Sequence, residues 1–140
     1  MKCDSSLLNQ KKPFFIPDWS TDIQMVRCQV VRICRLGKCI QSKFAYRYYD
    51  AIAPGVDFRA RDYMESNWAQ ATAFDNSLCV GEWETPSGEA NSSIDDAIAQ
   101  VSRIVTLRNG DLIFIDEPSE SQPIEKEMTI EDKNLYCKIK

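Results

Sequence analysis

Short runs of apolar and β-branched residues, separated by turn-forming residues, recur along this 140-residue chain and favour a fold built on strands. The longest run, residues 23–34, is rich in valine and isoleucine and is followed by a turn at Leu36-Gly37-Lys38. The same criteria predict further strands at residues 56–61, 77–80, 112–115, 128–130 and 135–139. We expect the last two of these strands to pair with each other.

Two segments favour helices. Ser42 is placed to cap a short helix that continues to residue 53, just before Pro54-Gly55. Ser93 opens a capping-box-like sequence, with Asp96 in place of the usual Glu or Gln. Apolar residues follow it at three- and four-residue spacing: Ile94, Ala97, Ile98, Val101 and Val105. Residues 84–92 and 116–126 are loop-like, and the length suits one domain, so we expect a single domain over residues 1–140.

The charge balance narrows the function classes. The formal net charge is −4 and the basic residues are scattered, which argues against a nucleic-acid or anionic-membrane surface. The one local excess of basic residues consists of Arg27, Arg32, Arg35, Lys38 and Lys43. We interpret these residues as solvated strand positions rather than as a binding patch. No stretch approaches the ~20 apolar residues of a membrane span. No apolar run follows the first residues, so we expect no secretory signal.

The chain contains no histidine, which removes the commonest general base and the commonest metal ligand. Any chemistry must therefore use carboxylates, lysine, tyrosine or cysteine. The six cysteines lack the paired Cys-x-x-Cys spacing of zinc sites. We expect them to be free, core-filling thiols in a reduced, cytoplasmic setting.

Four stretches carry residue patterns that agree in order, spacing and residue type with those of a known family. They are residues 13–23 (PFFIPDWSTDI), 44–62 (FAYRYYD followed by GVDFRARD), 73–81 (AFDNSLCVG) and 94–114 (IDDAIAQVSR followed by GDLIF). Together they resemble the fumarylacetoacetate hydrolase family, in particular its compact bacterial members. The most specific part is Asp57 followed by Ala60-Arg61-Asp62, and the resemblance covers nearly the whole chain.

The resemblance implies an α+β, β-rich fold in which a mixed, rolled β-sheet of the fumarylacetoacetate hydrolase type carries two short flanking helices. Family members use Mg²⁺, Ca²⁺ or Mn²⁺ to hold a dicarbonyl or 2-oxo acid. They hydrolyse carbon–carbon bonds, decarboxylate or tautomerise, and dimers are usual. Against that pattern this chain is a truncated domain, because an N-terminal segment and a segment between Trp83 and Asn91 have no counterpart.

The family's cation sits on three carboxylates, and the resemblance leaves only one of them here. The register places the two glutamates at Val26 and Cys28, which share one face of a strand, and the aspartate at Asp57. A hard cation takes about six oxygen ligands, which one aspartate cannot supply. We therefore expect no metal and no cofactor. The family's lysine and glutamine fall on Thr72 and Met64, so further site residues are replaced.

A lone buried carboxylate is costly unless it is paired. Our hypothesis is that an arginine, Arg59 first and then Arg61, neutralises Asp57 in place of the cation, because the three residues share a face if this stretch is extended. The alternative is that Arg59 is simply exposed on a strand edge. We assign these three residues and Asp75 to a remnant pocket, although Asp75 also suits a turn cap. We assign no catalytic residue.

These replacements predict a catalytically inactive fumarylacetoacetate hydrolase-like protein that acts as a small-anion-binding or dimerisation module. The alternatives are a divergent hydrolase or lyase acting on a 2-oxo acid or acylpyruvate, and a decaying gene product with no selected role. The missing segments leave sheet edges and apolar surface uncovered. We therefore expect a homodimer, or pairing with a full-length paralogue, and neither a nucleic-acid nor a membrane partner.

Overall fold

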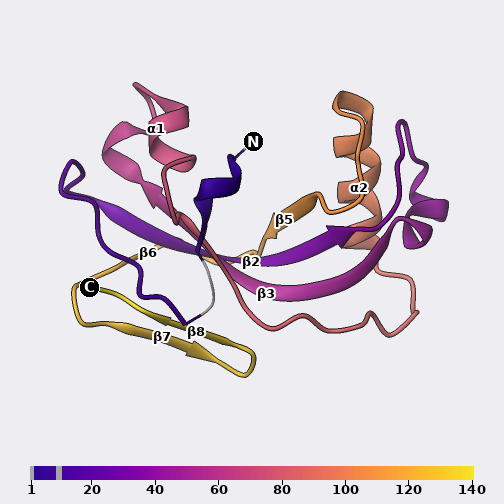
Figure 1. Cartoon of the computed structure of the whole chain (residues 1–140). Coiled ribbons are helices and arrows are strands. Elements are labelled where there is room, and N and C mark those ends of the chain that lie inside the picture. Colours follow the sequence, from indigo (N-terminus) through magenta and orange to yellow (C-terminus); the bar gives the residue numbers. More distant parts are fainter. Residues whose placement is uncertain (1, 9–10) are drawn as a thin grey trace. The chain divides into compact units, whose positions relative to one another are not determined.

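The computed structural model describes residues 2–8 and 11–140, and its strands and helices are shown in Figure 1. The strands are β1 (Leu7–Leu8), β2 (Ile23–Ile33), β3 (Tyr49–Ala60), β4 (Leu78–Val80), β5 (Leu112–Asp116), β6 (Gln122–Pro123), β7 (Thr129–Asp132) and β8 (Leu135–Lys138). The α-helices are α1 (Trp68–Thr72) and α2 (Ser92–Ile104), and the 3₁₀ helices are η1 (Asp4–Ser6), η2 (Ser42–Arg47) and η3 (Arg61–Tyr63).

The chain divides into two compact units. The first unit consists of Met1–Cys28, Pro54–Glu82 and Asp116–Lys140, and the second of Gln29–Ala53 and Trp83–Ile115. The long strands β2 and β3 lie side by side and contribute residues to both units (Figure 1). Within the first unit β1 pairs in parallel with β4, β4 pairs antiparallel with β3, and β6 pairs antiparallel with β2. The sheet is therefore mixed and the helices are few, as the sequence predicts.

The core of the first unit lies between one face of this sheet and the β7–β8 hairpin, which is yellow in Figure 1. Val56, Phe58 and Ala60 alternate along β3 and supply the sheet side of this core. Phe14 is 1% exposed and stacks on Phe58 with ring centroids 3.9 Å apart. The backbone N–H of Phe14 donates to the Lys138 carbonyl at 2.8 Å, so the Phe14 segment is joined to β8.

The second unit is built around α2, which packs against η2. The Asn91 side chain accepts a hydrogen bond from the N–H of Ile94 at 3.3 Å and caps the helix. The predicted cap at Ser93 is therefore wrong, because the helix already begins at Ser92. The apolar spacing is confirmed by the burial of Ile94 and Ile98 in the core of this unit.

The predicted helix from Ser42 to residue 53 is wrong beyond its first turns. The 3₁₀ helix η2 ends at Arg47 and β3 begins at Tyr49. Tyr49, Ala51 and Ala53 are buried while Asp50 is exposed, so the period is two rather than 3.6. The predicted strand 56–61 is the second half of a longer strand that ends at Ala60. The short helix α1 (Trp68–Thr72) was not anticipated.

The other predicted elements are present with small shifts. The strand predicted at residues 23–34 is β2, the strand at 112–115 is β5, and the two last predicted strands form the antiparallel β7–β8 pair. All six cysteines are free thiols. Cys28, Cys79 and Cys137 fill core positions as predicted, whereas Cys3 and Cys39 are exposed.

Candidate functional site

Asp57 lies in the middle of β3 in the first unit and is 2% exposed. Its neighbours Val56 and Phe58 point into the hydrophobic core, so Asp57 and Arg59 point to the opposite face of the strand. Asp57 is in register with Leu78 of β4. A carboxylate buried to this extent requires charged or hydrogen-bonding partners.

Arg59 supplies one partner from the same strand. Its Nε donates to Asp57 Oδ2 at 2.8 Å, and its Nη2 donates to both carboxylate oxygens of Asp116, each at 2.8 Å. Burial alone lowers the pKa of Arg59, but the hydrogen bonds and charges of Asp116 and Asp57 outweigh it and raise the pKa above its usual value. The ion pair predicted between Arg59 and Asp57 is therefore present, and the side chain of Arg59 is not simply exposed.

Lys2 supplies a second partner that the sequence analysis missed. Its Nζ donates to Asp57 Oδ1 and, at 2.9 Å, to Ser77 Oγ. Ser77 Oγ donates in turn to the Thr72 carbonyl at 3.2 Å. The Lys2 side chain is 7% exposed; burial lowers the pKa of its ammonium group, and the Asp57 charge opposes part of that shift. Lys2 and Asp57 are 55 positions apart, so no local pattern in the sequence could link them.

Val26 and Cys28, where the sequence analysis places the family's two glutamates, carry no charge. Cys28 is 1% exposed, and burial together with the nearby Asp57 charge raises the pKa of its thiol to about 12. Val26 is buried and shares a face of β2 with Cys28. The Cys28 thiol is therefore protonated at neutral pH and is neither a ready nucleophile nor a ready metal ligand.

These residues do not fit a hard divalent cation. Among the described residues, no three carboxylate, thiol or imidazole side chains are grouped to hold a metal ion. Asp57 uses both carboxylate oxygens in hydrogen bonds to cationic side chains, and Asp116 is bound by Arg59. Mg²⁺, Ca²⁺ and Mn²⁺ favour several oxygen ligands, which this cluster does not offer.

The other two residues assigned to the remnant pocket are not brought to Asp57. Strand β3 ends at Ala60 and Arg61 begins η3, so Arg61 does not continue the face shared by Asp57 and Arg59. Arg61 is exposed, as is Asp75, which precedes Asn76 in the turn before β4. Of the four residues, only Asp57 and Arg59 are in contact.

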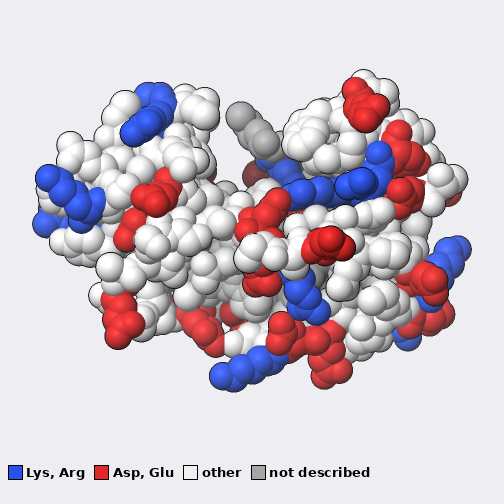
Figure 2. Space-filling model, turned by 180° about the vertical axis from the view of Figure 1, so that it is seen from behind, with Lys and Arg blue, Asp and Glu red and all other residues white. Residues whose placement is uncertain are grey.

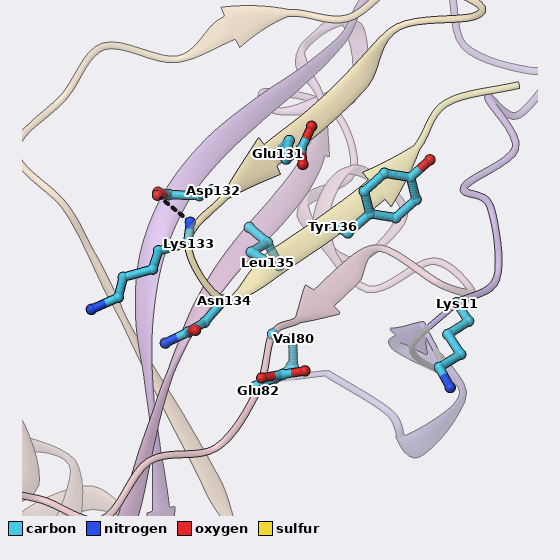
Figure 3. Close-up of a pocket in the computed structure, with 10 residues that line it drawn as sticks. Lys11, Val80, Glu82, Glu131, Asp132, Lys133, Asn134, Leu135 and Tyr136 are labelled. Carbon is cyan, nitrogen blue, oxygen red and sulfur yellow. Dashed lines mark hydrogen bonds between the residues drawn. The ribbon is translucent and has the colours of Figure 1, made fainter.

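A surface pocket of about 400 Å³ lies in the first unit, and Asp57 is not among the residues that line it. Figure 3 shows it between the segment of Val80 and Glu82 and the β7–β8 hairpin, with the side chains of Leu135 and Tyr136 along one wall. Lys11, Glu131, Asp132, Lys133 and Asn134 also line it. The pocket is lined by side chains of both charge signs and by apolar ones, and does not include any residue predicted for the site.

The surface charge agrees with the scattered basic residues of the sequence. On the face shown in Figure 2, Lys and Arg side chains are interspersed with Asp and Glu. Arg27 pairs with Asp132 at 3.2 Å and Arg32 pairs with Asp50 at 2.9 Å, so two residues of the local basic excess are engaged by carboxylates. Across residues 2–8 and 11–140, no helix has the length and apolar character needed to span a bilayer.

The class of fold follows from comparison with known proteins. No protein-family model and no curated protein matches the sequence. Solved structures do match, and they cover 99% of this chain. The chain has the fold of the fumarylacetoacetate hydrolase family proteins, as the resemblance predicts.

Three of these structures illustrate the similarity. The 5-carboxymethyl-2-hydroxymuconate delta-isomerase of Mycobacterium smegmatis has a TM-score of 0.86 at 18% identity over 66% of its own length. The fumarylpyruvate hydrolase of Pseudomonas aeruginosa, solved with Mn²⁺ and pyruvate, has a TM-score of 0.85 at 19% identity over 76% of its length. A fumarylacetoacetate hydrolase family protein of Yersinia pestis has a TM-score of 0.85 at 19% identity over 79% of its length.

The similarity extends over 99% of this chain but over a smaller share of each of these relatives. This chain spans 66% of the mycobacterial isomerase, and a second mycobacterial structure with a TM-score of 0.87 is covered to the same extent. At identities of 18–19% the likeness shows a common fold, and the neighbours include both hydrolases and isomerases.

Proposed function

We propose that this chain is a non-catalytic member of the fumarylacetoacetate hydrolase fold, and that it acts as a dimerisation module rather than as a metal-dependent hydrolase or isomerase. The main observation behind the proposal is that the carboxylate of Asp57 is already paired within the chain. Both of its carboxylate oxygens accept hydrogen bonds from cationic side chains of the same unit, Lys2 and Arg59. Val26 and Cys28 add no oxygen ligand on the neighbouring strand.

Charge counting favours dimerisation over small-anion binding. The cluster contains two cations, Lys2 and Arg59, and two carboxylates, Asp57 and Asp116, so its formal charge is zero. An anion brought to this cluster would have to break an existing ion pair, which costs several kcal/mol when the pair is buried. The cluster is therefore a poor candidate for an anion site.

Each unit also exposes large apolar side chains that a partner chain can cover. In the first unit Phe15 is 65% and Trp68 60% exposed, and in the second unit Leu36 is 67% and Ile104 81% exposed. The partner we propose is a second copy or a full-length paralogue. A reducing cytoplasmic setting, in which the six thiols stay free, is part of the same proposal.

The test combines metal binding, turnover and assembly. Calorimetric titration with Mg²⁺, Ca²⁺ and Mn²⁺ should give no binding in the micromolar range, and an acylpyruvate should not be turned over with or without these ions. Sedimentation velocity should give a dimer at micromolar concentration. Micromolar metal binding with turnover would replace this proposal with a divergent hydrolase or lyase. A clean monomer over the whole concentration range would remove dimerisation.

A further inference from the structure

The Lys2 side chain is held in the first unit as if it were a bound ligand. Its ammonium group contacts a carboxylate that is 2% exposed and a hydroxyl that is 0% exposed, although Lys2 comes from the N-terminal segment. Lysine is rarely buried in this way unless it is paired. The contacts therefore describe a small site, formed by Asp57 and Ser77, with an occupant supplied by the chain itself.

The chemistry of this site selects a group that only donates hydrogen bonds. Ser77 Oγ gives its proton to the Thr72 carbonyl, so it presents lone pairs to Lys2. Asp57 Oδ1 is likewise an acceptor, and Asp57 Oδ2 is held by Arg59. An ammonium group has three donors and no acceptor, so it matches a site made of acceptors. A divalent cation finds too few oxygen atoms here.

The segment that carries Lys2 has attachments of its own. Ser6 Oγ donates to the Ala73 carbonyl at 3.2 Å, and the N–H of Asn76 donates to the Ser5 carbonyl at 2.9 Å. Leu8 is buried in the core and lies in β1, which pairs with β4. Shortening Lys2 to alanine removes Cγ, Cδ, Cε and Nζ. The segment should therefore stay docked, and a channel that fits a propylammonium ion should open toward Asp57.

We propose that the Asp57–Ser77 site is a primary-ammonium site that Lys2 occupies in cis, and that it accepts an unbranched primary alkylammonium ion when the Lys2 side chain is absent. This inference rests on the proposed function, because a site that still held a divalent cation would have no room for an ammonium group. The inference adds to the proposed function the class of ligand that the Asp57–Ser77 site recognises.

Chemical rescue of Lys2→Ala tests the proposal. The variant should unfold at a lower temperature than the wild type, and n-propylammonium chloride should raise its Tm in a saturable manner. At ten times its dissociation constant a ligand increases the folded-to-unfolded ratio about eleven-fold. For a chain of this size that corresponds to about 5 °C. Tetramethylammonium chloride and NaCl at equal ionic strength should not produce the shift.

Two controls separate the site from general salt effects. Lys138→Ala removes a lysine that is paired with Glu127 at 3.6 Å and is half exposed, and n-propylammonium should not rescue it. Adding Asp57→Asn to Lys2→Ala removes the negative charge that faces the ammonium group, and the rescue should be lost. A Tm of Lys2→Ala equal to that of the wild type, or a rescue that survives Asp57→Asn, overturns the proposal.

Amine reactivity of the wild type provides a readout that does not depend on folding of the Lys2→Ala variant. With limiting acetic anhydride, followed by peptide mapping, Lys2 should be among the last lysines acetylated, and Asp57→Asn should make it reactive. Rapid acetylation of Lys2 in the wild type contradicts the proposal. Stabilisation of the wild type by Mn²⁺ would instead refute the proposed function, so the two failures are distinguishable.

Discussion

Replacing Asp57 with asparagine removes the carboxylate that two cationic side chains share. Lys2 then keeps Ser77 as a partner but has lost its counter-charge while 7% exposed. Arg59 keeps the bidentate contact with Asp116 and is 21% exposed, so it loses less. Removing one partner of a buried ion pair costs about 3–5 kcal/mol. Because Arg59 remains paired, we expect a loss of stability at the lower end of this range, about 3 kcal/mol, which corresponds to a drop in Tm of about 10 °C.

The double variant Lys2→Met, Asp57→Asn isolates the pair. Lys2→Met alone leaves Asp57 with Arg59, and the double variant leaves no uncompensated charge between the two positions. Replacing both members of a buried pair is far less costly than removing one. The double variant should therefore be more stable than the sum of the single changes predicts, by about 2 kcal/mol.

Urea unfolding followed by tryptophan fluorescence measures these differences. Trp19 and Trp68 lie in the first unit and Trp83 in the second, so selective replacement of tryptophans shows whether both units unfold together. Asp50→Asn is the matched control, because Asp50 pairs with Arg32 at 2.9 Å on the surface. An exposed pair contributes about 0–1 kcal/mol. A coupling energy between Lys2 and Asp57 within about 0.5 kcal/mol of zero, the usual limit of additivity, would refute the ion-pair argument.

Three further changes test separate parts of the fold. Among the described residues, Asp95 Oδ1 is buried without a hydrogen-bond partner, and burial raises the pKa of this carboxyl. The contribution of Asp95 to stability is therefore present below the unfolded pKa and is lost as pH rises through the folded pKa. Asp95→Asn should unfold at a higher urea concentration than the wild type at pH 7, and this difference should close toward pH 3. Phe14→Ala removes a ring stacked on Phe58 and should cost about 3–5 kcal/mol in urea unfolding, whereas a loss below 1 kcal/mol would contradict the core assignment. Gly81→Ala places a Cβ 2.2 Å from the Asn134 carbonyl oxygen, and the forced shift should lower stability by about 1–3 kcal/mol, measured by the same assay.

The elements that could be predicted from the sequence are those with a clear period. The Val- and Ile-rich run predicts β2 and the three- and four-residue spacing predicts α2, because burial imposes those periods on the sequence. The segment after Ser42 was misassigned because the short 3₁₀ helix Ser42–Arg47 is followed almost directly by the strand that begins at Tyr49, and Ser42 is the first residue of that helix rather than its cap. Tyr49 and Ala51 follow the strand period, which outweighs the helix propensity of alanine once they are buried.

The site was predictable only where its parts are close in sequence. Arg59 lies two positions from Asp57 on one strand, and the alternation of strand side chains predicts their contact. The same reasoning failed for Arg61, since it assumed that the strand continues past Ala60. Lys2 reaches Asp57 through the tertiary fold alone, and a lysine near the start of a chain carries no pattern that distinguishes it from a solvated one.

The uncharged residues Val26 and Cys28 on β2 and the buried Lys2 are electrostatically consistent with each other. With Val26 and Cys28 uncharged, Lys2 and Arg59 balance Asp57 and Asp116. Carboxylates at positions 26 and 28 would change this balance to −2, which is the charge that one divalent cation neutralises. A sequence with only one of the two carboxylates has a net charge of −1 that neither arrangement balances, and an unbalanced buried charge is strongly destabilising. The cluster with Val26, Cys28 and a buried Lys2 is therefore one neutral arrangement, and a single carboxylate introduced at position 26 or 28 should destabilise it.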